Sequence, residues 1–267
     1  MTIKIFDIKS TIISKNNAAM NWDNHSFIFK ESAKIIAEKT HELGEKFDDI
    51  LLITSDFNEL LTEIRGIQYK KITIFSQYKE LNKEKKKEKN IERISGLFEP
   101  LNIKGNFDLI ICHLSLHRIN DVINFAINLK KSLRDNGALV CSYFGGKTLI
   151  ELRDSLLKTD EYLNKVFYQR VIPYIDMIDA GNIFSKAAFT EIVSDKTTYK
   201  IKYSNFNKIL NDIKGVGENS CLVKRNKGLM TRNFLNTIEK FYSKDFKDPN
   251  RNFIATCEVI SLTMWNS

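Results

Sequence analysis

Several features that would fix a function class at once are scarce in this 267-residue sequence. The four cysteines, Cys112, Cys141, Cys221 and Cys257, are widely spaced and form neither a CxxC pair nor a Cys/His cluster. No structural zinc site or other metal site is therefore predicted. Cys112 and Cys141 lie in apolar runs, so they are expected to be buried free thiols, as in a reducing compartment. Only 3 prolines and 11 glycines occur, so long disordered linkers are not expected.

Long apolar runs are also missing. No stretch approaches the roughly 20 apolar residues that a membrane-spanning helix needs. The opening residues, MTIKIFDIKSTII, contain no signal-peptide cleavage pattern. We therefore expect a cytoplasmic protein without a membrane span.

Charge is biased to one sign, with a formal net charge of +8. Part of the excess lies in the mixed run KEKKKEK at 83–89. Such a run is typical of a solvated loop or helix end, and it lacks the interleaved aromatic residues of a single-strand nucleic-acid groove. Nucleic acid is therefore not the expected partner, and a basic RNA-binding module is kept as an alternative.

The first half of the chain alternates between apolar runs and helical patterns. Four runs favour buried strands: ILLIT (50–54), KITIF (71–75), FDLIIC (107–112) and ALVCSYF (138–144). Helical spacing marks residues 26–43, 58–65 and 120–133, the last followed by an Asp-Asn-Gly turn at 135–137. This alternation predicts an α/β fold with a doubly wound, mainly parallel sheet.

The second half changes pattern after residue 146. Helices are predicted at 147–158, 176–189 and 206–213, and strands at 197–203 and 253–265. No linker or internal repeat divides the chain. We therefore expect one domain over 1–267, with an N-terminal helical segment (1–44), a cofactor-side half (45–146) and a substrate- or partner-side half (147–267).

Several motifs in order resemble one family. FGGKTLIELRDSL (144–156) is the most specific, and IFDIKSTIISKNNAAM, FDLIICHLSLHRINDV, IPYIDMIDAGNIFSKAAF, DIKGVGENS and CEVISLTMW accompany it. They are similar to methyltransferase-fold proteins related to the mitochondrial assembly factor of respiratory complex I. They are more distantly similar to carrier-protein methyltransferases of the biotin pathway. The resemblance implies a seven-stranded class I methyltransferase sheet, with S-adenosylmethionine at the carboxyl ends of the first strands.

The loop after the first strand departs from the pattern that the resemblance implies. Methyltransferases of this fold have D-L-G-C-G-x-G here, because the backbone must approach the cofactor closely. Aligned on ILLITSDFNELL, the acidic position holds Leu52, and the three glycine positions hold Thr54, Asp56 and Asn58. Aspartate and asparagine tolerate positive φ better than most residues, but their side chains occupy space meant for the ligand.

Two further contacts of the resemblance are altered. The acid that holds the ribose is replaced by Ser76 and Gln77, with Glu80 too far along the chain; the acid at the adenine is replaced by Ser95 and Gly96, with Glu99 shifted. Losing such hydrogen bonds weakens binding by several orders of magnitude. The resemblance implies S-adenosylmethionine as cofactor, whereas these residues predict that it is not bound in the usual way. The candidate cofactor contacts are Thr54, Ser55, Asp56, Ser76, Ser95, His113 and Leu114.

Polar residues after FDLIIC are candidates for the substrate side, namely Ser115, His117, Arg118, Asn120 and Asp121. His117 is the candidate catalytic residue, as a general base, because its ordinary pKa is near neutrality. The alternative is a histidine satisfied by backbone hydrogen bonds at a strand–helix junction.

The FGG motif and the GVGEN segment supply the remaining candidates. Gly145 and Gly146 would allow a ligand close to the backbone, or form a simple tight turn. Arg153 is a candidate clamp for a carboxylate, while Glu151 is expected to pair with a lysine. The loop that contains Gly215, Gly217, Glu218 and Asn219 would cap the pocket or only end a helix.

Three functions follow from these observations. The leading hypothesis is a methyltransferase-fold protein with a degenerate cofactor loop that acts on or binds a partner protein in complex I assembly. The second is an active S-adenosylmethionine-dependent methyltransferase with a divergent loop. The third is the RNA-binding module, which salt-dependent RNA binding would support.

Overall fold

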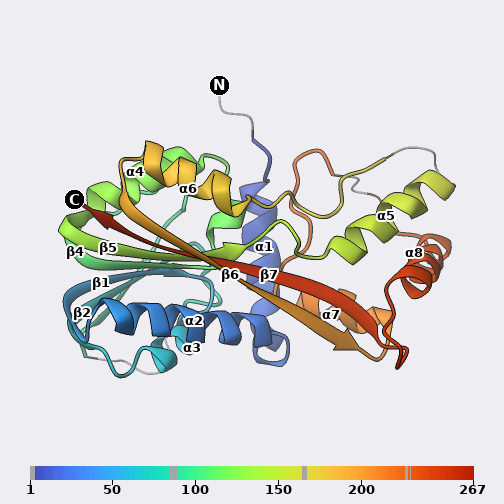
Figure 1. The fold of residues 1–267 in the computed structure, drawn as a ribbon, viewed down its shortest axis with the longest axis horizontal. Coiled ribbons are helices and arrows are strands. Elements are labelled where there is room, and N and C mark those ends of the chain that lie inside the picture. The colour runs from blue at the N-terminus through green and yellow to red at the C-terminus, as the bar shows by residue number, and fades with distance from the viewer. Residues whose placement is uncertain (1–3, 84–88, 164–166, 226–227, 229) are drawn as a thin grey trace.

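A computed structural model describes residues 4–83, 89–163, 167–225, 228 and 230–267 (Figure 1). Its centre is a seven-stranded sheet in the order β3-β2-β1-β4-β5-β7-β6. The strands are β1 (Lys46–Thr54), β2 (Gln68–Ser76), β3 (Ile91–Ser95), β4 (Phe107–His113), β5 (Leu133–Phe144), β6 (Thr190–Tyr203) and β7 (Phe253–Asn266). The first five are parallel to one another, and β7 is antiparallel to both β5 and β6. The predicted doubly wound, mainly parallel sheet is confirmed.

Helices cover both faces of this sheet. In Figure 1, α2 and α3 lie below it and α4 and α6 above it, while α5, α7 and α8 lie at the far end of β6 and β7. The α-helices are α1 (Ile8–Ala18), α2 (Phe27–Leu43), α3 (Phe57–Glu63), α4 (Val122–Ser132), α5 (Ile150–Leu163), α6 (Met177–Lys186), α7 (Phe206–Gly215) and α8 (Arg232–Asp245). Two short 3₁₀ helices, η1 (Ala19–Asn24) and η2 (Leu116–Arg118), complete the set.

The two faces of the sheet build separate apolar cores. Along β1, Ile50 and Leu52 pack with α2 and α3, whereas Leu51 and Ile53 pack with α4 and α6. This follows from the alternation of side chains along a strand. Because both faces are covered, the central strands read as continuous apolar runs. A third core joins α5, α7 and α8 to the first half of β7.

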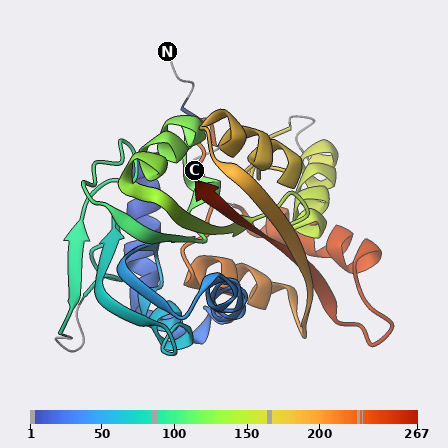
Figure 2. The same cartoon turned by 60° about the vertical axis from the view of Figure 1, so that its left-hand side comes forward.

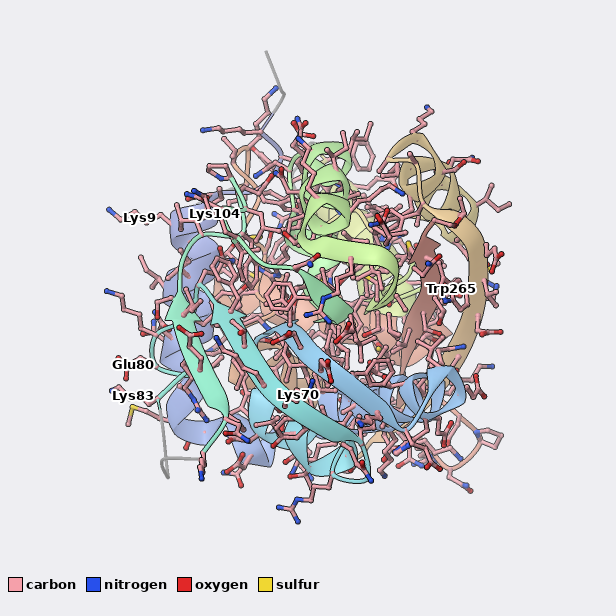
Figure 3. All side chains as sticks on the ribbon, turned by 90° about the vertical axis from the view of Figure 1, so that its left-hand side faces the viewer. Lys9, Lys70, Glu80, Lys83, Lys104 and Trp265 are labelled. Atoms are coloured by element: carbon pink, nitrogen blue, oxygen red, sulfur yellow. The ribbon has the colours of Figure 1, made fainter. Side chains whose placement is uncertain are left out.

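The edges of the sheet differ in length. Figure 2 shows the short β3 at one edge and the long β6 beside β7 at the other. Figure 3 shows the side of the molecule at which the parallel strands begin. Lys70 lies there near the start of β2, and Trp265 lies there near the end of the antiparallel β7. The carboxyl ends of the parallel strands therefore point into the middle of the molecule, toward α1.

The structure differs from the sequence-based elements at several places. The strand at Ile91–Ser95 and the helix at Arg232–Asp245 were not predicted. Leu133 begins β5 instead of ending α4, and the predicted turn at 135–137 lies inside β5, where Asn136 has a φ of 62°. The ladder between β4 and β5 shifts register there, so the turn residues form an irregularity in the strand.

Among the described residues, no helix is long and apolar enough to cross a membrane, and no cluster of His, Cys, Asp or Glu could hold a metal ion. All four cysteines are free and buried, which confirms the prediction for Cys112 and Cys141. The basic run at 83–89 has its residues 84–88 outside the described part of the chain.

Candidate functional site

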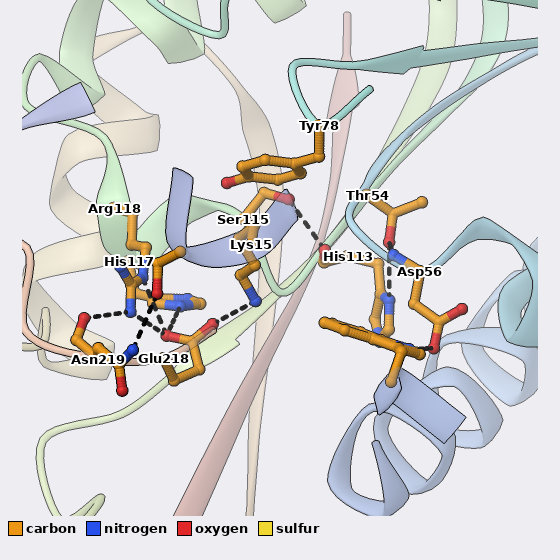
Figure 4. A network of polar contacts seen from close by, with 12 residues as sticks. Lys15, Thr54, Asp56, Tyr78, His113, Ser115, His117, Arg118, Glu218 and Asn219 are labelled. Carbon is orange, nitrogen blue, oxygen red and sulfur yellow. Dashed lines mark hydrogen bonds and ion pairs between the residues drawn. The ribbon is translucent and has the colours of Figure 1, made fainter. Parts of the chain in front are cut away.

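The carboxyl ends of β1 and β4 bring Thr54 and His113 side by side. The Thr54 hydroxyl lies 3.2 Å from Nδ1 of His113, and it accepts a 3.0 Å hydrogen bond from the backbone N–H of Asp56 (Figure 4). Both side chains are fully buried. Burial lowers the pKa of His113 to about 3, so the imidazole is neutral at physiological pH. The sheet topology thus assembles part of the predicted cofactor contacts.

The N-terminal segment covers this end of the sheet. The indole of Trp22, in η1, donates a 2.6 Å hydrogen bond from Nε1 to Oδ2 of Asp56, while Oδ1 of Asp56 accepts from the backbone N–H of Glu59 and caps α3. Burial raises the pKa of Asp56 from 3.8 to about 6 despite these bonds. Phe29 of α2 lies edge-on to both Trp22 and His113.

A buried charge cluster lies next to these contacts (Figure 4). Glu218 accepts from Nε and Nη2 of Arg118 at 2.9 and 2.7 Å, and from Nζ of Lys15 at 2.6 Å. Burial acts to raise the pKa of Glu218, but Arg118 and Lys15 outweigh it and hold that pKa well below its ordinary value. Burial lowers the pKa of Lys15, and the Glu218 carboxylate opposes that effect. Arg118 also donates to the Asn219 carbonyl oxygen.

His117 contacts the same carboxylate, with Nε2 at 3.3 Å from Oε2 of Glu218. Burial lowers its pKa, and Glu218 opposes the shift. Its Nδ1 is buried without a hydrogen-bond partner in the described part of the chain. The backbone-satisfied alternative is therefore not what the structure shows, and the role of His117 as a general base stays a prediction.

The two predicted contacts for ribose and adenine lie opposite each other in the β2–β3 ladder, at the carboxyl ends of these strands. Ser76 is buried at the end of β2, where its hydroxyl accepts from the backbone N–H of Tyr78. Ser95 is exposed at the end of β3. Glu99, the shifted acid, accepts from the backbone N–H groups of Asn120 and Asp121, so its carboxylate holds the segment before α4.

The polar residues after β4 serve mainly local structure. The hydroxyl of Ser115 donates to the carbonyl of His113, and Leu114 adopts a φ of 43° with its N–H on Ser142. Asp121 caps α4 by accepting from the backbone N–H of Asn124. Ser115, Leu114 and Asp121 therefore each make a hydrogen bond within the chain.

The FGG motif is shaped by β7. A Cβ on Gly145 would lie 2.5 Å from Oε1 of Glu258, so this glycine allows the strand to pass that carboxylate; a Cβ on Gly146 would meet open space. The expectation that Glu151 pairs with a lysine is wrong: it is buried and accepts from the N–H and hydroxyl of Thr256. Arg153 donates to the carbonyls of Gly146 and Thr148 and clamps no carboxylate among the described residues.

The GVGEN loop ends α7, as one of the two alternatives predicted, and it also lies against α1. Gly217 has a φ of 63°, and a Cβ there would lie 2.8 Å from the Cα of Lys15. The loop therefore packs directly on α1, and this close approach places Glu218 between Lys15 and Arg118. Asn219 adds a hydrogen bond from Nδ2 to the Ser14 hydroxyl.

Four buried polar atoms at this end have no hydrogen-bond partner among the described residues. They are Ser55 Oγ, His113 Nε2, His117 Nδ1 and Arg118 Nη1. Buried polar groups without a hydrogen-bond partner are rare, and each is explained by a bound water, a ligand or local strain. A mostly apolar cavity of about 70 Å³ adjoins Glu218, between Phe29, Phe144, Tyr174 and Val216.

Sequence reasoning did not find Lys15 and Trp22. Neither belongs to a motif with assigned chemistry, and their partners, Glu218 and Asp56, are 203 and 34 residues away. The only available signal was a tryptophan in a short segment rich in asparagine, NNAAMNWDN.

The sequence is similar to several characterised proteins. It is 28% identical to arginine-hydroxylase NDUFAF5, mitochondrial, of Dictyostelium discoideum, over 98% of this chain and 65% of that protein. It is 26% identical to the Homo sapiens protein of the same name, over 61% of this chain and 47% of that protein. The malonyl-[acyl-carrier protein] O-methyltransferase of Methylovorus sp. is 26% identical, over 60% of this chain and 52% of that protein. The chain thus spans 47% to 65% of the length of these relatives. No family model matches it.

Solved structures share the fold at low sequence identity. The YcgJ protein from Bacillus subtilis has a TM-score of 0.60 at 13% identity, covering 88% of this chain and 97% of that one. The putative methyltransferase solved with the Trm112 activator of Haloferax volcanii has a TM-score of 0.52 at 8% identity, covering 97% of this chain and 98% of that one. The sheet order and these likenesses show the class I methyltransferase fold.

Proposed function

We propose that this chain, a member of the class I S-adenosylmethionine-dependent methyltransferase superfamily, acts by binding a partner protein in respiratory complex I assembly. It does so without S-adenosylmethionine held in the usual way. The relatives' names include both a hydroxylase and a methyltransferase, so the names alone select no reaction. The proposal therefore rests on the site.

One observation carries the proposal: the cofactor end of the sheet is filled by the chain itself. Trp22 donates to Asp56, the residue at the second glycine position of the loop, and Lys15 bonds to Glu218. Asp56 is 4% exposed and Thr54 is fully buried. A ligand would have to displace an indole and an ammonium group, each of which already has its hydrogen bond. The residues as arranged do not fit S-adenosylmethionine.

A binding role is proposed because a methyltransferase fold without its methyl donor has no reaction to catalyse. None of the buried side chains of this end has a step to perform without the cofactor. The NDUFAF5 relatives are named as arginine hydroxylases, and the Methylovorus relative is named for a carrier protein, which also favours a protein partner. A cytoplasmic location stays a prediction.

A second candidate function is favoured by the four unpaired atoms Ser55 Oγ, His113 Nε2, His117 Nδ1 and Arg118 Nη1. Buried polar atoms without partners are found where a ligand binds. In this reading the N-terminal segment moves, and S-adenosylmethionine binds through a divergent loop to an active enzyme.

Calorimetric titration separates the two. The purified chain is titrated with S-adenosylmethionine and with S-adenosylhomocysteine, and an active class I methyltransferase serves as the control for both ligands. We expect no heat at millimolar ligand. Dissociation constants in the micromolar range, about −8 kcal/mol, would contradict the proposal and support the enzyme.

A further inference from the structure

A surface groove of about 420 Å³ lies between α1, the loop after β3 and α4. Its wall is mostly apolar and is formed by Ile8, Phe98, Pro100, Leu101 and Phe125. None of the described residues that line it belongs to the candidate cofactor contacts or to the charge cluster around Glu218. The groove is therefore a second recess, apart from the buried ends of β1 and β4.

Exposed apolar side chains flank this groove. Ile5, Leu97 and Ile123 are 42%, 48% and 41% exposed, and each is the chain neighbour of a residue in the lining. A recess with an apolar floor and apolar side chains at its margin is typical of a surface that binds another molecule. The polar groups of the lining then decide which molecule fits.

Asn120 shows how this part of the fold holds an extended chain. Its Oδ1 accepts from the backbone N–H groups of Ile5 and Phe6 at 2.8 Å each, and its Nδ2 donates to the carbonyl oxygen of Phe6 at 3.2 Å. Phe6 also forms an antiparallel bridge with Leu222, on the segment that leads from N to α1 in Figure 1. One asparagine amide thus satisfies both kinds of backbone group, because it carries a donor and an acceptor.

Two further asparagines of the lining, Asn124 and Asn128, have amide groups left to use. Nδ2 of Asn124 donates to Asp121, but its Oδ1 and both polar side-chain atoms of Asn128 make no hydrogen bond within the part of the chain that the structure describes. The two residues lie on one face of α4, about 6 Å apart along its axis. An extended chain presents the same backbone group about every 6.6 Å. The two amides are therefore spaced for backbone groups two residues apart in an extended peptide.

The charges of the lining indicate the sign of its ligand. Its charged side chains are Lys4, Glu99 and Asp121. The lining therefore carries one net negative charge, on a chain whose formal net charge is +8. This local reversal of sign favours a ligand with positive charge.

We propose that this groove docks an extended, basic segment of a partner protein. Alternate side chains of such a segment point to one side, so apolar residues two apart in its sequence enter the groove together. Asn124 and Asn128 bond to its backbone, and its lysine or arginine residues face Asp121 and Glu99. Such docking deepens the proposed function and rests on it for the nature of the partner, a protein.

Other occupants fit these groups less well. A helix already uses its backbone N–H and C=O groups within itself, so it would leave the two amides without backbone partners. A nucleic acid would bring phosphates to a lining of net negative charge. An extended peptide offers free backbone groups at the spacing of the two asparagines.

The probe is the peptide acetyl-Lys-Leu-Thr-Leu-Lys-amide, in which the two leucines point to one side of an extended chain. Calorimetric titration of the wild-type chain should give a dissociation constant below about 1 mM. Methylation of the backbone nitrogens of the peptide removes its N–H donors and should weaken binding at least about tenfold. Glutamate in place of both lysines should weaken it about tenfold.

Asn128→Ala tests whether the peptide lies in the groove. The variant loses an amide that bonds to the peptide backbone, so binding should weaken about fivefold. Asn236→Ala removes an exposed asparagine of α8, which does not line the groove, and is the matched control. It should bind the peptide as the wild type does, and thermal unfolding checks that both variants are folded.

Three results would overturn the docking site: no binding at about 1 mM peptide, equal binding of the methylated peptide, or equal affinity of Asn128→Ala and the wild type. Tighter binding of the glutamate peptide would overturn the assignment of a basic segment. All of these leave the proposed function standing, since titration with S-adenosylmethionine tests that function separately. Micromolar binding of S-adenosylmethionine would overturn the proposed function, and peptide binding that depends on Asn128 would still establish the groove.

Discussion

The two ends of the parallel strands hold their charges in opposite ways. At the amino ends, Arg134 bridges Asp49 and Asp108, and these three side chains are 33%, 34% and 25% exposed. At the carboxyl ends, Glu218 joins Lys15 and Arg118, and the exposed fractions are 7%, 1% and 3%. The same pairing chemistry is solvated at one end and sealed at the other.

This difference indicates where the molecule is under constraint. Exposed ion pairs are screened by water and salt and add little to stability, so they cost little to keep or to lose. Buried charges are expensive, and a buried cluster persists when every member is compensated. At the carboxyl end, His117 Nδ1 and Arg118 Nη1 also have no hydrogen-bond partner among the described residues, so the buried charges and polar atoms there cost stability.

The largest effect is expected from Glu218→Gln, which removes the carboxylate that is paired with both Lys15 and Arg118. Leaving these cations buried should cost about 3–5 kcal/mol of unfolding free energy. Urea unfolding at neutral pH measures it. A loss under about 1 kcal/mol would mean that the buried cluster around Glu218 contributes no more to stability than the exposed ion pairs of Arg134.

Asp56→Asn is expected to stabilise the protein, in a pH-dependent way. The folded-state pKa of about 6 lies above the ordinary 3.8, so ionising Asp56 costs stability as pH rises through this window, roughly 3 kcal/mol in full. Asparagine avoids that cost, although its single carbonyl oxygen can accept from the Trp22 indole or from the Glu59 backbone N–H but not from both.

Urea unfolding at pH 4 and pH 8 checks this. The stability of Asp56→Asn relative to the wild type should rise between pH 4 and about 6, by roughly 3 kcal/mol in full, and stay constant above that value. A difference that is independent of pH would contradict the account of Asp56.

Trp22→Phe removes the indole N–H and keeps most of the apolar volume. Asp56 then loses its strongest side-chain donor while it stays buried, which should cost about 1–3 kcal/mol. The free energies of unfolding of the wild type, Trp22→Phe, Asp56→Asn and the double variant form a double-mutant cycle. Additive changes would show that the 2.6 Å contact does not couple the two residues.

The smallest effect is expected from Arg134→Ala at the solvated end. Its two carboxylate partners remain hydrated, so the loss should be about 1 kcal/mol or less and should shrink further at high salt. Thermal unfolding at low and high salt measures it. A loss as large as that of Glu218→Gln would erase the contrast between the two ends.

The sequence predicts the frame better than the site, for physical reasons. The apolar runs ILLIT and FDLIIC predict β1 and β4, because strands that are buried on both faces are apolar throughout. Their order in a parallel sheet places Thr54 beside His113 without further information. By contrast, β3 is short and half-exposed, so IERIS carries no such signal.

The contents of the carboxyl end could not be predicted in the same way. Lys15 reads as one more surface lysine, since nothing near it in the sequence says that Glu218 folds onto it. Glu151 was misjudged for the same reason, because its partner Thr256 lies 105 residues away. Side-chain partners across the fold depend on packing, which local pattern does not specify.

The most direct test is a crystal structure of the wild-type chain grown with millimolar S-adenosylmethionine. The account predicts Nε1 of Trp22 on Asp56 and Nζ of Lys15 on Glu218, with no ligand between them. Density for the cofactor at the ends of β1 and β4, with α1 displaced, would contradict it.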